Sequence, residues 1–173
     1  MLEIETVRLH LRQFVVDDLD DLYRIYSNPE VTKYVGKGSK SKEETEEALL
    51  SMLEHWQQNG FGMWAVINKI DNRLIGRCGL CFMDNTLEVE LGYLLNEFYW
   101  GQGLATEASL AALKFGFEVL KLERIVAVAM PENFASRHIM EKVGMKFEKN
   151  AHYYKNDVVY YSLLRQNFFA LTR

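Results

Sequence analysis

The chain is poor in proline and cysteine and has no long apolar run, and each shortage narrows what it can be. With two prolines and no stretch rich in serine and glycine, no linker is evident, so we expect a single domain over residues 1–173. No apolar segment approaches the roughly 20 residues of a membrane-spanning helix. The first residues lack a basic segment followed by an apolar one, so we predict neither a signal peptide nor a membrane partner.

The chain also lacks an excess of positive charge. Its formal net charge is −4 and its isoelectric point about 5.6, which argues against a nucleic-acid partner. The apolar fraction of 49% and the charged fraction of 25% are those of an ordinary soluble globular protein.

The two cysteines, Cys78 and Cys81, form a C-x-x-C pair. Such a pair is compatible with a redox or zinc site. In a strand, however, a spacing of three places the thiols on opposite faces. A tetrahedral zinc site needs two further ligands, and the four histidines show no metal spacing; they are His10, His55, His138 and His152. We therefore expect two reduced thiols, no metal and a cytoplasmic location.

Four aspartates, Asp17, Asp18, Asp20 and Asp21, open a predicted helix. They are compatible with a metal cluster. We favour a solvated helix start, where carboxylates complement the partial positive charge of the helix N-terminus.

The order of predicted elements indicates an α+β fold: a mixed, mostly antiparallel sheet with helices over its faces. Short turns at Asp71-Asn72 and Asp84-Asn85 join three of the strands. Ser41 is the expected N-cap of a helix, with Glu44 completing a capping box. Strands are predicted over 7–14, 63–69, 74–84, 87–95, 123–130, 145–151 and 157–165, helices over 17–27, 42–59, 103–120 and 134–143, and a loop over 30–40.

Residues 88–107 carry the strongest functional signal. A strand is followed by Gly101 and Gly103 and at once by a helix. A helix start offers unpaired N–H groups and partial positive charge, and glycine lets an anion approach them. The turn is also compatible with no ligand at all. A P-loop would need lysine and a hydroxyl residue where Leu104 and Ala105 stand, and a dinucleotide-binding turn would need glycine or alanine at Thr106.

The segment WGQGLA, from Trp100 to Ala105, resembles the pyrophosphate loop of GCN5-related N-acetyltransferases, with the pattern Gln/Arg-x-x-Gly-x-Gly/Ala. Gly103 and Ala105 match, and Trp100 replaces Gln/Arg, as is frequent in the RimJ/RimL-type branch. Three further segments are also similar to that branch: the opening TVRLHLRQFVVDDLDDLYRIYSNPEVTKYV, the strand VELGYLL and the segment PENFASRHIMEKVGMKFE. The resemblance covers essentially the whole chain.

The resemblance implies the three-layer fold of this family and acetyl-coenzyme A as cosubstrate, without a metal. It assigns the diphosphate to the turn and helix start, and the pantetheine arm to the backbone of the preceding strand. The implied cofactor-binding residues are Tyr93, Leu95, Trp100, Gly101, Gln102, Gly103, Leu104, Ala105, Thr106, Asn133 and Ser136.

The resemblance also implies catalytic roles. Glu90 corresponds to a base that collects the proton of the amine, although it also fits a plain strand glutamate. Glu88, on the same face by the period of two, and Glu132 and Glu148 are possible substitutes. Met140 stands where many relatives carry a tyrosine that acts as general acid toward the departing thiolate. Ser136 occupies the place of a serine that is thought to take over this role in the RimJ/RimL branch.

Tyr34, Tyr153 and Glu90 are the expected acceptor-side residues, with Tyr154 beside them. A protein N-terminus is the favoured acceptor. Small amines such as polyamines, amino acids or aminoglycosides remain alternatives, as do a non-catalytic coenzyme A-binding module and a nucleotide-binding enzyme of another class. The expected assembly is a monomer or a homodimer.

Overall fold

One eight-stranded sheet runs through the molecule. The structure is a computed structural model that describes residues 2–171. The strands lie in the order β1-β2-β3-β4-β5-β6-β8-β7, and every neighbouring pair is antiparallel except β5 and β6. The mixed, mostly antiparallel sheet is therefore confirmed. The strands are β1 Ile4–Glu5, β2 Leu9–Gln13, β3 Met63–Asn68, β4 Arg73–Phe82, β5 Val89–Leu95, β6 Arg124–Ala129, β7 Lys146–Tyr153 and β8 Asn156–Leu164.

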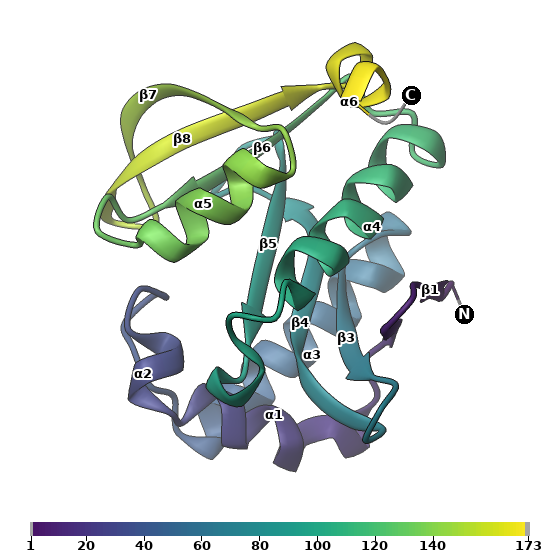
Figure 1. Cartoon of the computed structure of the whole chain (residues 1–173). Coiled ribbons are helices and arrows are strands. Elements are labelled where there is room, and N and C mark those ends of the chain that lie inside the picture. Colours follow the sequence, from purple (N-terminus) through teal and green to yellow (C-terminus); the bar gives the residue numbers. More distant parts are fainter. Residues whose placement is uncertain (1, 172–173) are drawn as a thin grey trace.

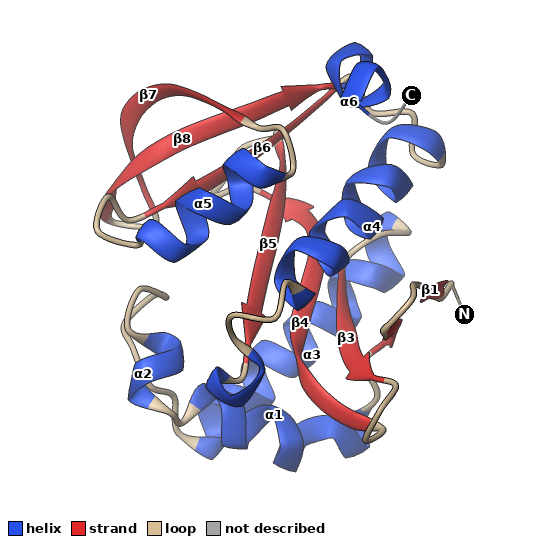
Figure 2. Cartoon of the chain, in the orientation of Figure 1, coloured by secondary structure: helices blue, strands red, loops and turns tan. Residues whose placement is uncertain are grey.

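Helices cover both faces of the sheet, which gives the three layers. In Figure 2, α4 and α5 lie in front of the strands, α3 lies behind them, and α1 lies at their lower ends. Residues of α1 and α3 share one core with the sheet. The helices are α1 Leu19–Tyr26, α2 Pro29–Thr32, α3 Lys42–Asn59, α4 Leu104–Glu118, α5 Phe134–Lys142 and α6 Arg165–Leu171, with 3-10 turns η1 Val16–Asp18 and η2 Glu97–Tyr99.

Alternate residues of the central strands supply two separate cores. Trp64 is fully buried on the α4 side, where its ring packs edge-on against Phe115 with 5.0 Å between centroids. Its neighbour Ala65 belongs to the other core, under α1 and α3. The cysteines follow the same rule: Cys78 lies 4.0 Å from the Ser109 hydroxyl of α4, and Cys81 lines a cavity beside α3. Both thiols are free, as predicted.

The sheet divides between β5 and β6. Their parallel pairing has one register position, Glu90 with Val126, whereas β6 pairs with β8 along its whole length. Figure 1 shows the two strands close together at one end of β5 and diverging toward its other end. The backbone of residues 93–95 consequently has no strand partner on the β6 side.

The predicted capping box of α3 is confirmed. The Ser41 hydroxyl accepts from the Glu44 N–H at 3.1 Å, and the Glu44 carboxylate accepts from the Ser41 N–H at 2.8 Å. The expected loop over 30–40 instead begins inside a helix. Pro29 takes the first position of α2, which suits its fixed φ, and the Asn28 side chain caps it. β1 and α6 were not predicted from the sequence.

The aspartate cluster is only partly the solvated helix start that we expected. Asp18 is buried, and its carboxylate accepts two hydrogen bonds of 2.8 Å from the Arg12 guanidinium and one of 2.8 Å from the Val15 N–H. Asp17 and Asp20 are exposed. Over residues 2–171, no group of three or more metal-ligating side chains is found.

We expect Asp18→Asn to lower the free energy of unfolding by about 2 kcal/mol, because it leaves the Arg12 guanidinium without its buried counter-charge. Urea denaturation followed by circular dichroism measures this. Asp17→Asn, at the exposed neighbouring position, should change stability little. Equal effects of the two variants would contradict a structural role for the Asp18 pair.

Candidate active site

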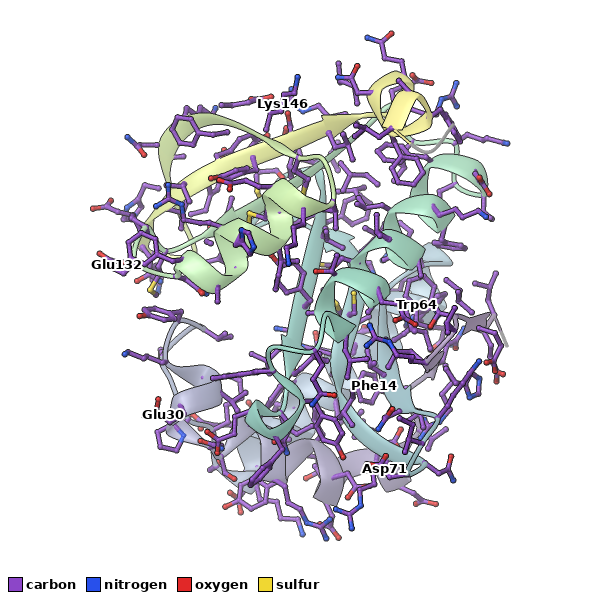
Figure 3. All side chains as sticks on the ribbon, in the orientation of Figure 1. Phe14, Glu30, Trp64, Asp71, Glu132 and Lys146 are labelled. Carbon is purple, nitrogen blue, oxygen red and sulfur yellow. The ribbon has the colours of Figure 1, made fainter. Side chains whose placement is uncertain are left out.

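Two hollows open where β5 separates from β6, and they meet there. The α3-side cavity lies under α3; residues that line it include Tyr26, Met52, His55, Arg77, Glu90, Gly92, Met140, Tyr153 and Tyr154. The α4-side groove runs to the start of α4; residues that line it include Leu95, Trp100, Gly101, Gly103, Leu104, Ala105 and Thr106. Tyr34, Val35, Tyr93, Asn133 and Ser136 line both. Glu30 on α2 and Glu132 ahead of α5 lie on opposite sides of the opening (Figure 3).

The start of α4 is built to leave its N–H groups free. Gly101 and Gly103 have left-handed backbones with φ of 71° and 77°, which other residues adopt only with strain. Gly103 is the N-cap of this 15-residue helix, and no side chain accepts its first N–H groups. By contrast, the Asn133 side chain caps α5. The α4-side groove therefore ends at an uncapped helix N-terminus, a ready site for an anion.

Arg8 holds this turn in place, a contact that was not predicted from the sequence. Its Nη1 donates to the Gln102 carbonyl oxygen at 2.8 Å, and its Nε pairs with the Glu107 carboxylate at 2.6 Å. The Thr6 hydroxyl donates to the same carboxylate at 2.7 Å. Residues between β1 and β2, at the edge of the sheet, thus hold the Gln102 carbonyl group in place.

Trp100 connects the turn to the end of β5. Its indole N–H donates to the Leu95 carbonyl oxygen at 2.9 Å, and its side chain is 50% exposed. The carbonyl group of Leu95 consequently has a partner within the chain.

Tyr93 contributes a hydroxyl as well as backbone. It donates to the Ser136 carbonyl oxygen at 2.8 Å and lies 2.9 Å from the Ser136 hydroxyl, between the two hollows. Burial raises the pKa of the Tyr93 phenol, so it stays protonated. Asn133 Oδ1 accepts from the Ser136 N–H at 3.2 Å, which holds this serine at the start of α5. Met140 is buried beside them.

Glu90 lies in the α3-side cavity and is 8% exposed. Burial raises the pKa of its carboxyl from 4.5 to about 7, while a hydrogen bond from the Tyr154 hydroxyl and the charge of Arg77 oppose the rise. A carboxyl with such a pKa can take up a proton near neutral pH.

Tyr154, rather than Tyr153, contacts Glu90. Its hydroxyl donates to the Glu90 carboxylate, and its N–H donates to Asp84. Tyr154 and Lys155 form the two-residue turn between β7 and β8 with φ of 54° and 60°, a conformation in which asparagine and glycine are usual. Tyr153 packs on Tyr160 and lines the cavity.

The alternative bases lie elsewhere. Glu88 lies just before β5 and accepts from the Tyr160 hydroxyl at 2.7 Å. Glu148 pairs with Arg124 at 3.1 Å. Glu132 is exposed. Of the four glutamates, Glu90 is the one that lines either hollow.

Comparison with known proteins identifies the family of the chain. Residues 8–146 match the model of the acetyltransferase (GNAT) domain. The chain belongs to the GNAT family. It is 30% identical over 171 residues to the uncharacterized N-acetyltransferase p20 of Bacillus licheniformis, covering 94% of this chain and 96% of that protein. It is 31% identical over 131 residues to YdaF, a candidate ribosomal N-acetyltransferase of Bacillus subtilis (strain 168), covering 68% and 69%.

The fold agrees with this membership. The crystal structure of a GNAT acetyltransferase from Bacillus anthracis superposes with a TM-score of 0.83 at 29% identity, covering 95% of this chain and 99% of that one. The chain is therefore an acetyl-coenzyme A-dependent N-acyltransferase. None of the helices among residues 2–171 is long and apolar enough to cross a membrane.

Burial of Glu90 predicts an effect on stability. Because its pKa in the folded chain is raised, the native state keeps a proton that the unfolded chain releases, and unfolding becomes easier as pH rises from 4.5 to about 7. The effect is on the order of 3 kcal/mol. We expect Glu90→Gln to be more stable than the parent at about pH 8 and no more stable near pH 4. Thermal unfolding at both pH values tests this, and an equal difference at both would contradict it.

Proposed function

We propose that this GNAT protein acetylates the N-terminal amine of a protein or peptide in the cytoplasm, in the manner of RimJ/RimL-type enzymes, with Glu90 as the base. The observation that carries the proposal is the meeting of the α3-side cavity, which holds Glu90, with the α4-side groove, which ends at the uncapped α4 helix. The likeness to YdaF supports this choice of acceptor.

The α4-side groove suits acetyl-coenzyme A. The N–H groups over 101–106, with the Thr106 hydroxyl, would bind the diphosphate without a metal. The backbone of Tyr93 and Leu94, unpaired on the β6 side, would bind the amide groups of the pantetheine arm as an added strand. Leu95 would contribute packing, since its carbonyl accepts from Trp100.

Glu90 suits the acceptor amine. The amine attacks only when neutral, and an α-amino group with a pKa near 8 loses its proton more readily than a lysine with a pKa near 10.4. Glu90 would accept that proton directly or through a water molecule, while Tyr34 and Tyr153 line the acceptor side. Transfer would be direct, because burial raises the pKa of both cysteine thiols to about 12 and leaves them poor nucleophiles.

Ser136 would donate a proton or a hydrogen bond to the departing thiolate, with Tyr93 beside it. Both hydroxyls lie at the junction of the two hollows, 2.9 Å apart, where Met140 replaces the usual tyrosine. Burial keeps the Tyr93 phenol protonated, so Tyr93 would hold Ser136 in position rather than give up its own proton.

A panel of acceptors tests the function by release of coenzyme A thiol from acetyl-coenzyme A. It contains peptides with free N-termini, N-blocked lysine peptides, polyamines, amino acids and aminoglycosides. We expect the highest turnover with the free N-termini, increasing as pH rises through about 7, where Glu90 loses its proton. Glu90→Gln should lower turnover about 100-fold or more and leave the affinity for coenzyme A unchanged. Full turnover by this variant would remove Glu90 from its role.

The same panel separates the alternatives. Preferred turnover of a polyamine or an aminoglycoside would favour a small-molecule acetyltransferase. Binding of coenzyme A without turnover of any amine would favour a non-catalytic module. Thermal stabilisation by ATP or NAD but not by coenzyme A would contradict the cofactor assignment. Sedimentation would distinguish monomer from homodimer.

Gly103→Val should weaken coenzyme A binding by roughly 10-fold or more, because its side chain crowds the turn and strains a backbone at φ 77°. Isothermal titration measures the dissociation constant. Gly60→Val is the matched control: Gly60 has φ 73°, caps α3, and has no atom within 4 Å of an added Cβ. Equal loss of affinity in both variants would count against the α4 turn as the diphosphate site.

A further inference from the structure

Arg77 is a cation in the α3-side cavity without a carboxylate partner. It projects from β4, in the middle of the sheet, and is partly exposed where it lines the cavity. Its Nε donates to the Tyr26 hydroxyl at 2.7 Å, and its Nη1 lies 3.6 Å from the Met63 sulfur. Among residues 2–171, no Asp or Glu oxygen lies within ion-pair distance of it. Other arginines do have such partners: Arg8, Arg12, Arg24, Arg124 and Arg165.

A guanidinium held in the cavity without an opposite charge reduces stability unless a bound group pairs with it. A guanidinium has five N–H donors in a planar fork, and here a phenol and a weakly accepting thioether engage two of its nitrogens. Among residues 2–171, no buried side-chain nitrogen or oxygen lacks a hydrogen-bond partner. The remaining Nη2, which has no acceptor among these described residues, therefore retains access to the cavity.

The guanidinium lies beside Gly92. A Cβ added at Gly92 would come within 2.7 Å of Met63 Cε and 3.4 Å of Arg77 Nη1. Gly92 lies two residues from Glu90 on the same face of β5, which is a separation of roughly 7 Å. The guanidinium and the base thus occupy neighbouring positions along one side of the cavity.

The charges of the cavity agree with an anionic group on the acceptor. Its lining includes two cationic side chains, Arg77 and Lys40, and one carboxylate, Glu90. The Glu90 carboxylate must accept a proton during the reaction, so it is not available as a permanent counter-ion. A polyamine would bring further positive charge next to Arg77, whereas a carboxylate would pair with its fork in two hydrogen bonds.

On the basis of the proposed function, we infer that the acceptor carries a carboxylate a few bonds from its amine, and that Arg77 binds this carboxylate while Glu90 faces the amine. Because Arg77 lies beside Gly92, two residues along β5 from Glu90, a molecule with its amine and carboxylate close together would reach both groups. The carboxylate can belong to a free amino acid or to the side chain of an acidic first residue in a peptide.

Matched acceptor pairs test this inference. Peptides that begin with Asp or Asn and have blocked C-termini test the side-chain source, and free amino acids against their amides test the α-carboxylate. We expect the charged member of at least one pair to have a kcat/KM at least 10-fold higher. Arg77→Gln should remove that preference and leave the KM for acetyl-coenzyme A unchanged. Equal kcat/KM values within both pairs would overturn the inference, while the proposed function would stand on the turnover itself.

Two further variants separate binding from structure. Tyr26→Phe removes the hydroxyl that accepts from Arg77. If Arg77 had only a structural role, this variant would lose the preference for charged acceptors as Arg77→Gln does. We expect Tyr26→Phe to keep the preference. Arg77→Lys keeps the charge in case Arg77→Gln does not fold, and should retain part of the preference. If no amine is turned over, calorimetry with the coenzyme A-loaded protein decides: tighter binding of the charged members, lost in Arg77→Gln, supports the inference, and equal binding overturns it.

Discussion

The separation of β5 from β6 is the constraint on which the rest of the site depends. These strands share one register position, at Glu90 and Val126, and then diverge. Had they paired throughout, the backbone of residues 93–95 would be saturated and neither hollow would reach the middle of the sheet. The divergence is tolerated because each half has its own support: β5 pairs fully with β4, and β6 pairs fully with β8.

The position of Glu90, where β5 and β6 are paired, determines the pKa of its carboxyl. Strands on both sides and the β7–β8 turn exclude water from Glu90, so burial raises its pKa, and the Tyr154 hydroxyl and Arg77 limit that rise. The result is a carboxyl that titrates near neutrality. The same burial destabilises the charged form, so the base reduces the stability of the fold in the pH range where it can act.

Local signals in the sequence predicted much of this molecule. The Ser41 and Glu44 cap of α3 and the strand boundaries from 63 to 95 depend on residues close together in the chain, and the structure has them as predicted, within one to two residues. The contacts that the sequence did not reveal join distant residues. Arg8 meets Glu107 only because α4 packs on the sheet beside β2, and Tyr154 meets Glu90 only because the sheet brings the β7–β8 turn to β5. Asp18 stands in a run of aspartates that is typical of a solvated helix start. Only the folded chain shows that its carboxylate is buried against Arg12.

The turn at Tyr154 and Lys155 affects two properties at once. It sets the backbone strain of the β7–β8 hairpin, and through the Tyr154 hydroxyl it lowers the pKa of Glu90 on β5. Asparagine and glycine would fit the left-handed backbone with less strain, but neither could reach across to β5. Because the Tyr154 hydrogen bond lowers the pKa of Glu90, a GNAT protein with a relaxed turn at this place would hold its strand glutamate protonated up to a higher pH. The residues at the tip of one hairpin would therefore set the pH range over which such an enzyme works.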